Sequence, residues 1–176
     1  MKMFVLSHFN TILGPTPIIS LPNDLNPELT TFIAELMNFH HVKDDFFIHT
    51  TKELNTANQT FEIKSQKARG GNEFLLVSTI FTDKNYDLHP MQEIISEFIE
   101  KLKTLPEFPQ LLTKNRLQPD ILSPSFMNSE QICHDFYDSI HLENFHHQSD
   151  ESKPNKAIIH QDSKFVKKAT QFLKKF

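Results

Sequence analysis

Runs of apolar residues along the chain predict five β-strands. They are Met3–Phe9, Thr16–Leu21, Phe46–Thr51, Thr60–Ser65 and Phe74–Phe81. Pro17 cannot donate a ladder hydrogen bond, so we expect the second strand at a sheet edge. The fourth run, TFEIKS, alternates apolar and polar residues, which predicts a strand buried on one face. The fifth, FLLVSTIF, is nearly continuous in apolar residues and predicts a central strand covered on both faces.

Apolar residues at helical spacing predict two helices that pack on this sheet. Asn26 is expected to cap the first, with Pro27 at its first position. Pro90 is expected to start the second helix and Pro106 to end it. The two buried stripes are Leu29, Phe32, Ile33, Leu36 and Met37 in the first helix, and Met91, Ile94, Ile95, Phe98, Leu102 and Leu105 in the second. The order strand, strand, helix, three strands, helix predicts an α/β fold of the α+β type with an antiparallel sheet.

The clear apolar periodicity of the sequence ends after Pro106, and we divide the chain there. Residues 1–107 form the predicted sheet domain, and residues 108–156 form an extension. The extension is expected to hold a short helix over Ser129–Ile140, capped by Asn128, and then a polar linker. Residues 157–176 predict a basic amphipathic helix. Its expected docking or membrane contacts are Phe165, Lys167, Lys168, Phe172, Leu173 and Phe176.

Charge and cysteine content exclude several classes of protein. A formal net charge of −4 argues against a nucleic-acid binder, because phosphate contacts need a surplus of Lys and Arg. The single cysteine, Cys133, can form neither an internal disulfide nor a paired-cysteine zinc site. No apolar run is long enough to span a bilayer, and no secretory signal is visible. These features predict a cytoplasmic protein.

The chain offers little catalytic or metal-binding chemistry. It has no phosphate-binding loop and no nucleophile motif, so we expect no intrinsic catalytic activity and no cofactor. The adjacent pairs His40–His41 and His146–His147 lack the i, i+4 spacing of two ligands on one helical face, and His134 with His141 fits no ligand pattern, so no metal site is expected. Cys133 beside His134 is expected to be a buried, inert thiol rather than a nucleophile.

The motif HFNTILGPTPIISLP, together with the element order, resembles the longin-domain family. The resemblance is strongest to the N-terminal longin domain of the nitrogen permease regulator 2-like proteins, and it extends to longin-domain proteins of archaea. It covers residues 1–105 and implies a five-stranded antiparallel sheet with one helix on one face and two on the other. Gly14 and Pro15 fall in the Leu-Gly-Pro turn of that motif, where we expect them to have a structural role.

The resemblance also implies a function in GTPase regulation. In the resembling family an arginine before the central strand acts as an arginine finger on a Rag-type GTPase, and Arg69 occupies that place here. The implied partners are a small Ras-like GTPase and a second longin or roadblock domain. The plainer alternative for Arg69 is a solvated turn residue beside Lys67.

Two other functions stay open from the sequence. The chain could be a vesicle-trafficking or complex-assembly scaffold whose basic C-terminal helix lies peripherally on an anionic membrane or in a partner's groove. That helix could equally dock on the sheet domain itself. A small-molecule sensor ranks last, because the central strand offers mainly Ser78 and Thr79 as polar groups.

Overall fold

A computed structural model describes residues 2–40, 42–66, 68, 70–82, 87–106, 108–109, 112 and 124–142, with side chains of 127–140 in the last segment. Its centre is one five-stranded antiparallel sheet with the order β2-β1-β5-β4-β3. The strands are β1 Lys2–Asn10, β2 Gly14–Leu21, β3 Phe46–Thr50, β4 Asn55–Lys64 and β5 Asn72–Phe81. β5 is the middle strand, so the run FLLVSTIF is central and buried as expected.

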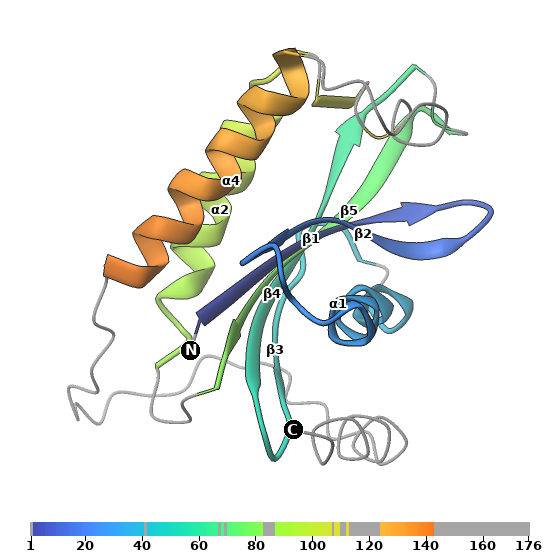
Figure 1. The fold of residues 1–176 in the computed structure, drawn as a ribbon. Helices are drawn as coiled ribbons and strands as arrows, with labels where there is room; N and C mark the ends of the chain where they lie inside the picture. The colour runs from blue at the N-terminus through green and yellow to red at the C-terminus, as the bar shows by residue number, and fades with distance from the viewer. Residues whose placement is uncertain are drawn as a thin grey trace.

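Helices cover both faces of the sheet (Figure 1). One face carries α1, Pro27–Ala34, which continues into the 3₁₀ turn η1, Glu35–Asn38. The opposite face carries α2, Met91–Lys103, and α4, Pro124–Leu142, which lie side by side. The predicted α+β fold, with one helix on one face and two on the other, is therefore confirmed.

Two local predictions about the first strands and helix are confirmed. The Asn26 side chain accepts a hydrogen bond from the Glu28 N–H at 2.8 Å, and Pro27 is the first helical residue. This cap satisfies one of the N–H groups that a helix start leaves unpaired. Pro17 lies in β2, which is an edge strand, so its missing N–H leaves no gap inside the sheet.

The predicted fourth strand is wrong in its start and in its burial. β4 begins at Asn55 rather than Thr60, and its residues are buried on both faces almost throughout. The polar residues Thr56 and Asn58 face α1 rather than water. Asn58 Nδ2 donates to Thr56 Oγ1 at 2.8 Å, so neighbouring polar side chains bond to one another inside the fold. A polar sequence can thus form a covered strand when part of its polar groups find partners, as Asn58 Nδ2 does. Among the described residues, Asn55 Oδ1 and Asn58 Oδ1 are buried without a hydrogen-bond partner.

The predicted short helix of the extension is also wrong in its start. α4 begins at Pro124, so Asn128 is a residue of its first turns and not its cap. The expected apolar positions do face the core, because Phe136 and Ile140 are buried and Ile132 packs at the margin. α4 therefore contributes to the same hydrophobic core as the sheet.

Three phenylalanines tie β1 to both helices of its face. Phe4 is fully buried, and its ring meets Phe98 of α2 edge-on at a centroid distance of 5.6 Å. The Phe4 ring also meets Phe136 of α4 at 5.4 Å, and Phe98 stacks on Phe136 at 4.2 Å. Aromatic pairs at these distances add to the burial of area. The cluster fixes both helices against the sheet and so positions the strand ends.

Candidate partner-binding end of the sheet

The topology brings three connections to one end of the sheet, which we call the hairpin end. It comprises the β1–β2 turn (Thr11–Leu13), the α1–β3 connection (described at residues 39–40 and 42–45) and the β4–β5 turn (described at residues 65–66, 68 and 70–71). Neighbouring strands lie about 4.8 Å apart, so the midlines of the β1–β2 and β4–β5 hairpins are about 10 Å apart in the sheet. In Figure 1 the β1–β2 hairpin extends to the right and the β4–β5 hairpin extends toward the top.

The β1–β2 turn is built by Asn10 and Gly14. Asn10 Oδ1 accepts hydrogen bonds from the backbone N–H of Ile12 at 2.9 Å and of Leu13 at 3.2 Å. Gly14 has φ +80°, in the left-handed region that favours glycine, and Pro15 follows it in β2. With the backbone held in this way, Ile12 is 87% exposed and Leu13 75% exposed. The turn therefore presents two aliphatic side chains to solvent.

The β4–β5 turn has a defined frame around the position of Arg69. Ser65 donates its N–H to the Gly71 carbonyl at 2.9 Å, and Gly71 donates to the Ala68 carbonyl at 3.0 Å. Gly70 and Gly71 have φ of +101° and +81°. Arg69 itself and Lys67 lie outside the described residues. Because both φ angles are positive, a residue other than glycine would adopt these backbone conformations only at a cost in conformational energy.

A buried polar pair joins the two hairpins beneath these turns. His8 Nε2 of β1 lies 2.8 Å from Glu73 Oε2 of β5, and the two side chains are 5% and 6% exposed. β1 and β5 are hydrogen-bonded neighbours, with His8 opposite Leu75. A buried pair of this kind is costly to separate, because each group would lose a partner away from water. The pair therefore holds the two hairpins in a fixed relation.

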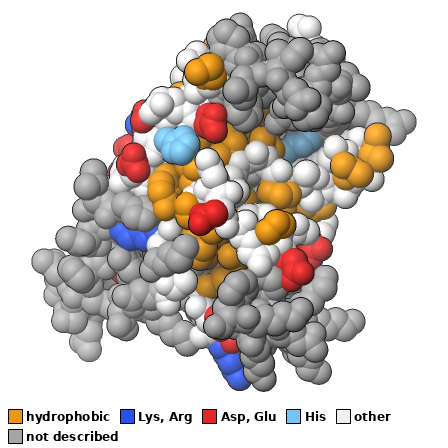
Figure 2. All heavy atoms as spheres, in the orientation of Figure 1, with side chains coloured by type: hydrophobic (Ala, Val, Ile, Leu, Met, Phe, Trp, Pro, Cys, Tyr) orange, Lys and Arg blue, Asp and Glu red, His pale blue; other side chains and the backbone are white. Residues whose placement is uncertain are grey.

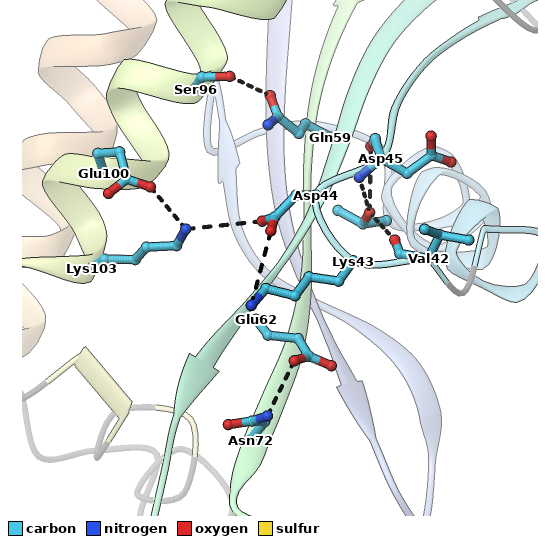
Figure 3. Close-up of polar contacts among 11 residues, drawn as sticks. Val42, Lys43, Asp44, Asp45, Gln59, Glu62, Asn72, Ser96, Glu100 and Lys103 are labelled. Carbon is cyan, nitrogen blue, oxygen red and sulfur yellow. Dashed lines mark hydrogen bonds and ion pairs between the residues drawn. The ribbon is translucent and has the colours of Figure 1, made fainter.

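The α1–β3 connection is held by the polar contacts in Figure 3. Thr60 Oγ1 accepts from the Asp45 N–H at 3.0 Å and donates to the Val42 carbonyl at 2.5 Å. Asp44, with φ +56°, lies 3.9 Å from Lys103 of α2 through its carboxylate. Surface ion pairs such as this one add little stability, so the Thr60 hydrogen bonds are the more important restraint. Val42 is left exposed at this end.

The two edges of the sheet differ in how they could accept another strand. Pro15 and Pro17 pair with Phe9 and Ser7 of β1, and the register shifts between Leu6 and Ser7. Prolines and a bulge are the features by which edge strands resist pairing with a further chain. β3 contains no proline, and among the described strands it pairs only with β4. Of the two edge strands, β2 therefore carries the features that oppose further pairing.

The other predicted residues are distributed as follows. The C-terminal positions Phe165, Lys167, Lys168, Phe172, Leu173 and Phe176 lie outside the described residues, as do His41, His146 and His147. His40 is buried, 3.0 Å from Asp45 through its Nδ1, and its ring stacks on Phe47. Within the described part of the chain, no three His, Cys, Asp or Glu side chains gather as a metal site would require.

Sequence reasoning missed the exposed pair Ile12 and Leu13. The turn was identified, but its two aliphatic residues were not considered as a contact. A signal was present, because turns favour Gly, Pro, Asn, Asp and Ser, and a branched aliphatic pair there is unusual. The His8–Glu73 pair was also missed, because its partners are far apart in sequence.

Cys133 is buried in the core between α4 and the sheet. Burial, with a smaller contribution from the Glu130 charge, raises the pKa of its thiol far above the usual range. The thiolate is the reactive form, so native protein should react very slowly with a thiol reagent such as 5,5′-dithiobis(2-nitrobenzoate) at pH 8, and denatured protein should react at once. Rapid labelling of the native protein would contradict the burial.

Comparisons with known proteins bear on the fold alone. No protein-family model matches the sequence, and no curated protein matches it. Among solved structures, the chain is similar to the K. lactis Lst4 longin domain, with 16% identity over 80% of this chain and 96% of that chain, and a TM-score of 0.47. The fold assignment rests on this chain's own five-stranded antiparallel sheet, with one helix on one face and two on the other, which is the arrangement that the longin resemblance implies. In the described residues, no helix combines the length and the apolar character needed to cross a bilayer.

Proposed function

We propose that this chain is a protein-interaction module that binds a small Ras-like GTPase and stimulates its hydrolysis of GTP. The observation that carries the proposal is the frame of the β4–β5 turn. Arg69 follows Ala68 and precedes two glycines with positive φ, at the end of a hairpin whose strands are buried. A turn closed by backbone hydrogen bonds at the end of a buried hairpin suits an arginine that must enter another protein's nucleotide site.

The electrostatics around the turn support the same role. Two carboxylates flank it in sequence, and both are already engaged: Glu73 with His8 at 2.8 Å, and Glu62 with Asn72 Nδ2 at 3.1 Å. A guanidinium that acts on a developing phosphoryl charge must not be held by a neighbouring carboxylate. Each of these carboxylates thus has a described partner elsewhere, which supports the proposed role of Arg69.

The β3 edge is the proposed contact for a second longin or roadblock domain. β3, Phe46–Thr50, is the edge strand opposite β2 and contains no proline. A strand added at this edge would extend the sheet. Such a partner would leave the β1–β2 turn free, since β1 and β2 lie at the other side of the sheet.

The test of the proposal is a pull-down with the full chain against the small GTPases of the same genome. Each GTPase is loaded in turn with GDP and with a non-hydrolysable GTP analogue. We expect one GTPase to be retained in a nucleotide-dependent manner. Retention of none would overturn the proposal. Sedimentation with anionic vesicles, comparing wild type with Lys167→Glu/Lys168→Glu, would then test the membrane scaffold instead.

A further inference from the structure

The most exposed apolar side chains of the described residues lie together on the β1–β2 turn. Ile12 and Leu13 are 87% and 75% exposed. Both values are higher than those of the other exposed large hydrophobic residues, Phe39, Val42 and Met127. Figure 2 shows hydrophobic side chains at the projecting end of this hairpin, on the right of the view. A solvent-exposed aliphatic pair at a turn has no role in the core, so its presence indicates a contact with another molecule.

The backbone of Ile12 and Leu13 is ordered by hydrogen bonds within the turn. Asn10 Oδ1 binds the N–H groups of both residues, and the turn is closed by Gly14 at positive φ. Thr16 Oγ1 adds a hydrogen bond to the Gly14 carbonyl at 3.1 Å. Because the backbone is already ordered, little further ordering is needed when the side chains enter a pocket.

The position of the pair relates it to Arg69. The β1–β2 and β4–β5 hairpins end at the same end of the sheet, and the His8–Glu73 pair joins their strands where the β1–β5 ladder ends, at His8 and Leu75. A partner that holds Ile12 and Leu13 would therefore face the end of the sheet that also carries the β4–β5 turn. Two turns at one end of the sheet suit a separate anchor and a catalytic contact on one partner surface.

A protein pocket fits this end better than a lipid surface. Asp44 and Asp45 lie in the α1–β3 connection of the same end, and the Asp44 side chain is 50% exposed. Lys43 and Lys103 lie 4.0 and 3.9 Å from the Asp44 carboxylate, so the described residues of this connection carry no surplus of cations to attract anionic headgroups. The tip itself, Asn10–Gly14, is uncharged, whereas lipid-binding loops usually pair apolar residues with cations.

We propose that Ile12 and Leu13 form the apolar anchor by which the hairpin end docks into a hydrophobic pocket of the GTPase. This inference rests on the proposed function, and it names the contact that supplies affinity, whereas Arg69 supplies the effect on hydrolysis. The two roles are thus separable by mutation. Ile12→Ser/Leu13→Ser should weaken binding, and Arg69→Ala should remove stimulation.

The test compares the full-length wild type with Ile12→Ser/Leu13→Ser and with Met127→Ser as a matched control. Met127 is an exposed apolar residue of α4, which belongs to neither hairpin. All three proteins should unfold at the same temperature, because these side chains are exposed. Affinity is measured by biolayer interferometry against the small GTPases of the genome, loaded with the GTP analogue, and stimulation is measured at saturating concentrations of each protein.

We expect the double variant to bind at least tenfold more weakly, Met127→Ser to bind as wild type does, and stimulation at saturation to be kept. Equal affinity of wild type and double variant would overturn the anchor and leave the proposed function standing. Loss of anionic-vesicle binding in the double variant, with GTPase affinity unchanged, would overturn it in favour of a lipid contact. If wild type binds no GTPase, both the anchor and the proposed function fail.

Discussion

Replacement of Arg69 by alanine is expected to abolish stimulation of GTP hydrolysis while leaving the affinity for the GTPase and the stability of the fold unchanged. An arginine supplied in trans stabilises the charge that develops on the transferred phosphoryl group, and its loss costs about 10³–10⁵ in rate. Arg69 follows the first turn residues of the β4–β5 hairpin, whose frame is closed by the Ser65–Gly71 and Gly71–Ala68 backbone hydrogen bonds. Those bonds do not depend on the Arg69 side chain.

Single-turnover hydrolysis measures this effect directly. Lys67→Ala is the matched control, because it removes a cation from the same turn and should keep most of the stimulation. Arg69→Lys should be nearly as inactive as the alanine variant, since an ammonium lacks the planar fork of the guanidinium. If Arg69→Ala stimulates as well as wild type, Arg69 is a solvated turn residue and not a finger.

Replacement of Phe4 by alanine is expected to produce the largest loss of stability of any single change considered in the sheet. Phe4 is fully buried and contacts Phe98 and Phe136, so one ring joins β1 to both α2 and α4. Truncation of a buried phenylalanine removes transfer energy and leaves a cavity, at a cost of about 3–5 kcal/mol in the free energy of unfolding.

Urea unfolding followed by circular dichroism tests this prediction, with Phe39→Ala as the control. Phe39 is half exposed after η1, and its truncation should cost well under half as much. A loss below about 1 kcal/mol for Phe4→Ala would mean that the three-ring cluster does not hold the helices to the sheet. The placement of the strand ends would then need another explanation.

The elements with strong local signals could be predicted from the sequence. Pro17 placed its strand at an edge because a missing N–H is tolerated only there. Asn26 and Pro27 marked the start of α1, because capping is a local interaction between neighbouring residues. The continuous apolar run of β5 marked the central strand, since only a strand covered on both faces needs such a sequence.

The parts that depend on distant partners could not be predicted. The start of β4 is polar, and Asn58 is accepted inside the fold because it bonds to Thr56 and to the Phe47 carbonyl of β3. The early start of α4 was missed because Asn128 is a plausible cap. The hairpin end could not be predicted for the same reason, because its three connections come from separate parts of the chain.

The most direct test of the central claim is the affinity of the full chain for the small GTPases of the same genome in each nucleotide state, measured by isothermal titration calorimetry. We predict saturable one-to-one binding that is at least tenfold tighter for the GTP-analogue form than for the GDP form. That difference would mean that the chain contacts the nucleotide-sensitive surface of the GTPase. Equal affinity for both forms, or no heat of binding with any small GTPase of the genome, would contradict a role in GTPase regulation.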